Sequence, residues 1–239
     1  KSLCPATSSQ ASSNWNNTST YRFSNAPELG YSAYNLPHMI KASAFYRFHI
    51  ANNKNFTTTI GVIYQGRSGS PYSMLYSGDL NGDNGRGNDL MFIPTDEQID
   101  LMPFKAQGNY TEDLQRQNLK AWLAKTPYLK DHRGEYFKRN ADNLPFENHF
   151  DFHVAEKMSV KVGKQVHALE LSLDILNVGN LLNKDWGRTY GTTYSNELIS
   201  PLTYDGGKFQ FLSTPDYVIK YPQSYYSRWR GQLGLKYTF

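Results

Sequence analysis

The chain has 239 residues, a formal net charge of +4, a mean hydropathy of −0.63 and a single cysteine, Cys4. These values exclude an internal disulfide framework and a CxxC metal or redox site, and the scattered basic residues give no support for nucleic-acid binding. No run approaches the roughly 18 consecutive apolar residues of a membrane helix, whereas barrel strands are polar on average and stay compatible with this composition. Because the chain begins at Lys1 without a signal segment, we expect it to be a piece of a longer product.

In chain order, residues 1–37 come first, and their Ser and Asn content is typical of a loop. Five later segments alternate apolar and polar residues with a period of two, which is the primary sequence signal of a β-strand. The predicted strands cover residues 40–50, 56–65, 149–154, 169–175 and 229–239. Alternation alone fits a soluble β-sandwich with one wetted face as well as it fits a membrane barrel.

The connections between these strands differ greatly in length. A tight turn at Asn52–Asn55 joins the first two strands, and another at Lys161–Lys164 joins the third and fourth. By contrast, about 80 residues separate the second and third strands, and about 45 separate the fourth and fifth. Compact soluble domains seldom contain such long connections, whereas outer-membrane barrels have short turns at one end and long extracellular loops at the other.

Both long connections contain predicted secondary structure. In the first, Thr111 is a candidate N-cap for a helix over residues 112–125, and Pro127 is expected to end it. In the second, residues 198–203 and 208–212 form a predicted hairpin around an Asp-Gly-Gly turn.

Aromatic residues lie near the ends of the apolar strand faces, where interfacial girdles of a membrane barrel belong. They are Tyr46, Phe48, Tyr64, Phe150, Trp229, Tyr237 and Phe239. Together with the connection lengths, they predict an all-β fold: an antiparallel, up-and-down transmembrane β-barrel with long extracellular loops that contain a short helix.

Three motifs carry a family resemblance. Asp174–Trp186 reads DILNVGNLLNKDW, Arg228–Phe239 reads RWRGQLGLKYTF, and Asp79–Pro94 reads DLNGDNGRGNDLMFIP. The first two motifs together resemble the C-terminus of TonB-dependent outer-membrane receptors. The third is similar to a loop of the large subgroup that has an N-terminal carboxypeptidase-regulatory-like domain. The tripeptide Arg139-Asn140-Ala141 and the tetrapeptide Pro145-Phe146-Glu147-Asn148 fit the same subgroup.

The resemblance implies that these are the last five or so of about 22 barrel strands. It also implies a set of partners. They are the lipid bilayer, a plug domain, the remaining strands, the TonB system acting through a missing N-terminal part, and, as a candidate, a surface lipoprotein that covers the barrel. The final strand resembles the signal that the outer-membrane assembly machinery recognises. The residues of that signal are Trp229, Leu233, Leu235, Tyr237 and Phe239.

On this basis we divide the chain into two parts. Residues 1–37 are expected to be the remnant of an extracellular loop. Residues 38–239 are expected to form the C-terminal part of the barrel, with residues 67–147 and 178–223 as long extracellular loops.

The strongest candidate for a metal site lies in the third motif. Asp79, Asn81, Asp83 and Asp89 present carboxylate and amide oxygens at alternate positions of a Gly-rich loop, which suits a hard cation such as calcium. The EF-hand pattern is incomplete, because Asn84 stands where that pattern has Gly and no Glu closes the loop. An Asn/Gly turn cluster on the surface is the alternative.

Other chemistry has less support. Residues 66–70, GRSGS, miss the last Gly of the G-x-S-x-G nucleophile motif, so we expect no enzyme activity. His149, Asp151 and His153 share one strand face, but at about 3.3 Å per residue the two histidines lie roughly 13 Å apart, too far for one zinc ion. We interpret them as polar lining of the barrel lumen.

The inward strand faces and the long loops supply the remaining candidates. Charged and polar residues expected to face the lumen, as partners of a plug, are Lys41, Arg47, Gln65, Glu170, Asp174, Arg230 and Lys236. Exposed aromatic residues of the loops are candidate ligand contacts: Tyr72, Tyr76, Trp122, Trp186, Tyr190 and Tyr194.

The resulting hypothesis is part of a TonB-dependent transporter in the outer membrane of a Gram-negative bacterium, with loops at the cell surface. It would bind and import a large nutrient such as an oligosaccharide, a peptide or a chelate. Two alternatives remain: a non-transporting outer-membrane barrel or adhesin whose loops bind a partner, and a soluble β-sandwich binding module.

Overall fold

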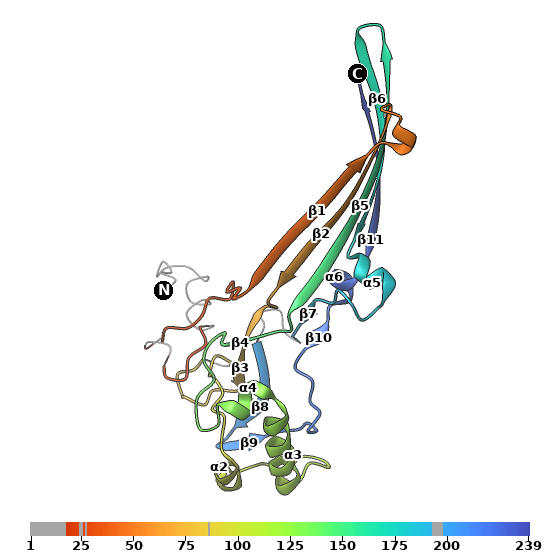
Figure 1. Ribbon diagram of the computed structural model, residues 1–239. Helices are drawn as coiled ribbons and strands as arrows, with labels where there is room; N and C mark the ends of the chain where they lie inside the picture. The colour runs from red at the N-terminus through yellow and green to blue at the C-terminus, as the bar shows by residue number, and fades with distance from the viewer. Residues whose placement is uncertain (1–17, 24–25, 27, 86, 193–197) are drawn as a thin grey trace. The chain divides into compact units, whose positions relative to one another are not determined.

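The computed structural model describes residues 18–23, 26, 28–85, 87–192 and 198–239. The chain is built mainly from strands, with few and short helices (Figure 1). It divides into two compact units. We call residues 36–69, 145–191 and 222–239 the long-sheet unit, and the described parts of 1–35, 70–144 and 192–221 the connection unit.

The long-sheet unit contains a five-stranded antiparallel sheet. Its strands, in spatial order, are β1 (Met39–Phe48), β2 (Phe56–Arg67), β5 (Glu147–Val162), β6 (Gln165–Leu176) and β11 (Arg230–Thr238). Figure 1 shows these strands running side by side, with the β5–β6 hairpin extending past its neighbours. All five predicted strands are therefore present, and β5 is considerably longer than predicted. Over the described residues the sheet is open, with β1 and β11 as its edges.

Both predicted tight turns are present. A single turn of 3-10 helix, Ile50–Asn52, follows β1, and Ala51 and Asn52 have positive φ angles of 51° and 57°. Between β5 and β6, Val162 pairs with Gln165 across a loop of two residues. The first of these is Gly163 with φ 63°, a conformation that glycine adopts without steric cost.

The connection unit contains a four-stranded sheet in the order β4, β3, β8, β9. The bounds are β3 (Pro71–Ser77), β4 (Asp142–Asn143), β8 (Leu198–Asp205) and β9 (Lys208–Gln210). The β8–β9 hairpin confirms the predicted one. The parallel pairing of β3 with β8, in which Ser73 is opposite Leu198, was not predicted.

Helix α3 (Glu112–Lys125) has the predicted bounds, and the Thr111 hydroxyl accepts a hydrogen bond from the backbone N–H of Leu114 at 3.2 Å. Helix α3 ends before Pro127, as predicted. Pro127 then begins a separate short helix, α4 (Pro127–Asp131), because a proline at the first helical position lacks only an N–H that would be unpaired anyway.

The other short elements are α2 (Asp96–Leu101), α5 (Val178–Leu182), α6 (Ser224–Ser227), β7 (Tyr190–Gly191) and β10 (Tyr221–Pro222), of which β7 and β10 pair with each other. In the described part of the chain, no helix is long and apolar enough to span a membrane.

The core of the connection unit joins the two long connections. The Trp122 ring, 2% exposed, lies 5.5 Å from the ring of Phe211, and its indole N–H donates to the backbone carbonyl of Tyr217 at 3.2 Å. Nearby, the Asn118 side chain donates to the carbonyl of Ser213 at 2.9 Å. Helix α3 of the first connection thus packs on residues of the second.

Candidate functional site

The register of the long sheet sorts its side chains into two faces. Residues that pair across antiparallel strands lie on the same face, and alternate residues of one strand do too. One row across the sheet contains Tyr46, Ile60, Val154, Leu173 and Leu233. Every member of this row is apolar or aromatic.

We call the face that carries this row the apolar face. Its large side chains are exposed on all five strands, with Leu233 76% and Leu235 72% exposed. Large apolar or aromatic members of the face are Ile40, Tyr46, Phe48, Phe56, Ile60, Val62, Tyr64, Phe150, Phe152, Val154, Met158, Leu169, Leu171, Leu173, Ile175, Leu233, Leu235 and Tyr237. So large and contiguous an apolar surface indicates contact with lipid or with another protein.

Glu156 is the one carboxylate on this face among the described strand residues. It is paired in register with Thr58, whose hydroxyl donates to Glu156 Oε2 at 2.5 Å. The other carboxylate oxygen, Oε1, is buried and has no hydrogen-bond partner in the part of the chain described here. The next residue of this row on β6 is Leu171, so the polar pair lies within apolar surroundings.

Aromatic rings lie toward both ends of the apolar face. At the end of the tight turns, Phe56, Met158, Leu169 and Tyr237 form one row. Toward the opposite end, the Tyr64 ring lies 4.7 Å from that of Phe150. An amphipathic ring suits the boundary between an apolar and an aqueous environment.

The opposite face, which we call the polar face, carries all seven residues predicted to face a barrel lumen. By register these are Lys41, Arg47, Gln65, Glu170, Asp174, Arg230 and Lys236. In the strand register, Glu170 lies opposite a lysine on each neighbouring strand, Lys157 on β5 and Lys236 on β11. The two faces therefore differ sharply in charge.

The three β5 residues that were weighed as zinc ligands each have separate partners. His153 Nδ1 lies 2.6 Å from Asp174 Oδ1, and the Asp151 carboxylate accepts the backbone N–H of Asn177 at 2.7 Å. His149 Nε2 lies 3.3 Å from the Thr189 hydroxyl. Their side chains thus stabilise neighbouring strands and loops of the long-sheet unit.

Asn177, in the DILNVGN motif, holds the end of β6 in place. It has a left-handed conformation with φ 53° and is 5% exposed. Its side-chain amide donates to the carbonyl oxygens of Gly187 at 2.9 Å and Ser227 at 2.8 Å. One side chain therefore ties β6 to the loop that follows it and to the segment before β11, a role that the sequence analysis did not identify.

The Gly-rich loop folds around its own acidic side chains. The Asp79 carboxylate accepts backbone N–H groups from Gly82 at 2.7 Å and Asn84 at 3.0 Å. Asp89 Oδ2 accepts the N–H groups of Leu80 at 2.5 Å and Asn81 at 3.3 Å. These carboxylates therefore serve first as acceptors for backbone donors that the loop would otherwise leave unpaired.

Among the four candidate calcium ligands, Asp89 differs from Asp79, Asn81 and Asp83 in its burial. It is 2% exposed, and its Oδ1 atom is buried without a hydrogen-bond partner among the described residues. Burial raises the pKa of Asp89, the two backbone N–H donors oppose this shift, and the nearby charges of Asp83 and Asp79 add to it. No cluster of three or more His, Cys, Asp or Glu side chains within the described ranges is placed to hold a metal ion. Calcium binding by this loop stays a prediction.

The expected exposure of the aromatic ligand contacts is wrong for three of them. Tyr72, Tyr76 and Trp122 are 3%, 2% and 2% exposed and belong to the core of the connection unit, where burial raises the pKa of both tyrosines. Trp186 is exposed and Tyr190 is half-buried, so both stay candidates. Tyr194 lies outside the described residues.

The residues of the predicted assembly signal lie in and next to β11. Leu233, Leu235 and Tyr237 are exposed on the apolar face, and Trp229 and Phe239 flank the strand, also exposed. Tyr237 and Phe239 stack with their ring centroids 5.9 Å apart.

Comparisons of the chain with family models, with curated proteins and with solved structures found no match.

The buried carboxylate of Asp89 gives a first prediction. Its raised pKa means that the folded loop favours the protonated form, so this contribution to stability is present below about pH 4 and is lost as the pH rises through the higher pKa. Asp89→Asn keeps an acceptor for the two N–H groups and removes the charge. We expect it to stabilise residues 79–89 at pH 7 by about 1 kcal/mol, as measured by hydrogen exchange in the intact protein.

The matched control is Asp113→Asn, whose carboxylate is 87% exposed and which should change stability by less than about 0.5 kcal/mol. Bound calcium would reverse the first result, because it would compensate the Asp89 charge. In that case calcium stabilises the unsubstituted loop and Asp89→Asn weakens it.

Proposed function

We propose that this chain forms the C-terminal part of the transmembrane barrel of a TonB-dependent outer-membrane transporter that imports a large nutrient. The observation that supports this most strongly is the exposed apolar face, which covers all five strands of the long sheet and faces away from a highly charged opposite face. A barrel in a membrane needs this division, with hydrocarbon outside and a polar lumen inside.

The connections support the same proposal. Both tight turns, at 50–55 and 163–164, lie at one end of the long sheet, and the two long connections leave from the other end. Short periplasmic turns and long extracellular loops have this arrangement in outer-membrane barrels. In the proposal, the strands of the rest of the barrel pair with β1 and β11, since a bilayer does not tolerate unpaired strand edges.

The polar face and the connection unit would then have separate roles. Charged residues of the polar face, such as Glu170 between Lys157 and Lys236, would line the lumen and pair with a plug domain. The connection unit, with its own core, would form the cell-surface part that meets the nutrient. Trp186 and Tyr190, which lie in the long-sheet unit in the segment after β6, are further candidate contacts with the nutrient.

A transporter and a non-transporting adhesin differ in their dependence on energy. If the protein is a transporter, deletion of its gene and deletion of TonB should abolish the uptake of the same nutrient, while nutrient binding at the cell surface persists without TonB. Uptake of radiolabelled oligosaccharide, peptide and chelate pools would measure this. Surface binding with no TonB-dependent uptake of any pool would support the adhesin instead.

The Glu156–Thr58 pair provides a test of the membrane location. In a bilayer, a carboxylate on the lipid-facing side is unfavourable, so replacing the pair by Glu156→Leu with Thr58→Val should stabilise the barrel by about 1 kcal/mol. Urea unfolding in phospholipid vesicles would measure the change. The control is Glu170→Leu on the polar face, which should destabilise the barrel because it removes the negative charge between Lys157 and Lys236, the residues opposite it in the register.

If the apolar face were instead exposed to water or covered by a soluble partner, the double variant would aggregate without detergent and gain nothing in vesicles.

The last residue gives a prediction about assembly. Deleting Phe239 should lower the amount of folded protein in the outer membrane by about tenfold, because it removes an aromatic residue of the proposed assembly signal and its stacking on Tyr237. Thr238→Ala, which alters a side chain on the polar face of the same strand, is the control. Heat-modifiable migration of outer-membrane fractions reports the folded amount, and an unchanged level after the deletion would contradict this role.

A further inference from the structure

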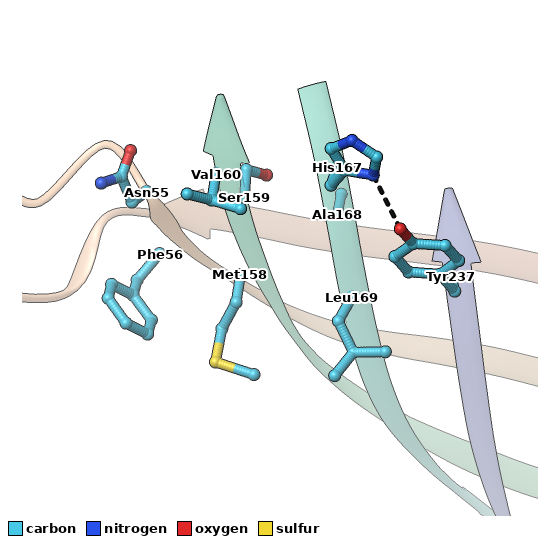
Figure 2. A pocket seen from close by; sticks show the side chains of 9 residues that line it. All are labelled: Asn55, Phe56, Met158, Ser159, Val160, His167, Ala168, Leu169 and Tyr237. Carbon is cyan, nitrogen blue, oxygen red and sulfur yellow. Dashed lines mark hydrogen bonds between the residues drawn. The ribbon is translucent and has the colours of Figure 1, made fainter. Parts of the chain in front are cut away.

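A groove lies on the long sheet at the end of the tight turns. It has a volume of about 340 Å³, within the usual range of roughly 300–1,000 Å³ for small-molecule sites. Figure 2 shows that its lining comes from β2, β5, β6 and β11 and from the turn before β2. Among the residues that line it are Phe56, Met158, Val160, His167, Leu169 and Tyr237.

The floor of the groove follows from the strand register. Phe56, Met158, Leu169 and Tyr237 form one cross-strand row of the apolar face. The β5–β6 hairpin continues past the start of β2, so that Val160, opposite His167, forms a further row with no neighbour from β2. The first row contains residues from four strands and the second from only two. This difference leaves an apolar hollow with a polar group at one side.

That polar group is a pair of side chains from β6 and β11. His167 Nδ1 lies 2.7 Å from the Tyr237 hydroxyl, and the two rings are stacked at a centroid distance of 6.0 Å (Figure 2). If Tyr237 donates, the imidazole carries its proton on Nε2, and if Nδ1 donates, the Tyr237 O–H is left to donate elsewhere. In either tautomer, one further donor remains for an acceptor in the groove.

Each tight turn beside the groove carries a lysine, Lys54 in the first and Lys164 in the second. Lys161 is on the polar face by register, and Glu156, the carboxylate of the apolar face, lies one row from the groove floor, toward the opposite end of the sheet. Basic side chains beside an apolar face favour an amphiphile with a negative head group, since lysines attract anionic lipid head groups. This charge pattern argues against an uncharged occupant.

We propose that the groove binds one phospholipid, with an acyl chain along Phe56, Met158 and Leu169 and the phosphate at the His167–Tyr237 pair. Lys54 and Lys164 of the two turns supply the positive field around the phosphate. The proposal rests on the proposed function, because it requires the apolar face to lie in a bilayer, and it assigns the groove to the leaflet at the tight-turn end.

The test uses the full-length protein in a non-ionic detergent and native mass spectrometry. Dioleoylphosphatidylglycerol is titrated against dioleoylglycerol, which has the same chains and no phosphate, and against glycerol phosphate, which has no chains. We expect the first phosphatidylglycerol to bind at least about tenfold more tightly than either comparison compound. The double variant His167→Ala with Tyr237→Phe should lose this preference.

Tyr64→Phe is the matched control, because it removes a hydroxyl from the same face toward the opposite end of the sheet. It should retain the preference for phosphatidylglycerol. Equal binding of the two lipids by the unsubstituted protein would overturn the lipid site, whether or not the double variant folds, and so would an equal loss in Tyr64→Phe. Equally tight binding of glycerol phosphate would reduce the site to a phosphate site and also overturn the proposal.

The same preparation separates this proposal from the membrane assignment. A protein that is monodisperse without detergent overturns both. A protein that requires detergent and migrates in a heat-modifiable way, but shows no preference for phosphatidylglycerol, overturns only the lipid site.

Discussion

The strand register of the long sheet is the constraint on which the other features depend. Side chains alternate between the two faces, so a slip of one residue in β5 would move Val154 to the charged face and bring Lys157 and His153 among apolar neighbours. The tight turns help to hold the register, since a loop of two residues at Gly163 leaves little freedom for slippage between β5 and β6. At the other end of β6, Asn177 adds three hydrogen bonds that require the same alignment.

The two units of the chain bury their apolar side chains in different ways. In the connection unit, Trp122, Phe104 and Phe211 are almost fully buried, as in the core of a water-soluble domain. In the long-sheet unit the large apolar side chains are mostly exposed, and buried residues of its strands such as Ala155 and Ala168 are small. One chain therefore combines a self-contained core with a sheet whose apolar face is left exposed.

The long sheet was predictable to the extent that its alternation is regular. The third predicted strand stopped at Val154 because Glu156 occupies an apolar position, whereas β5 continues to Val162 in the structure. Helix α3 could be predicted from the cap at Thr111. Strand β3 could not, because residues 71–76 are buried on both faces and show no alternation. The same burial explains why Tyr72 and Tyr76 were mistaken for exposed loop residues. The role of Asn177 could not be predicted either, because no local sequence pattern indicates hydrogen-bond partners so distant in the chain.

The parallel pairing of β3 with β8 has a consequence for the order of folding. Ser73 and Leu198 are separated in the chain by the whole of β5 and β6, so this pairing closes a very long loop. The hairpins of the long sheet need only neighbouring segments and can form earlier. Strand β3, with its apolar residues Met74 and Leu75, must therefore stay unpaired with β8 until the second connection arrives, and in this interval it is an aggregation-prone segment.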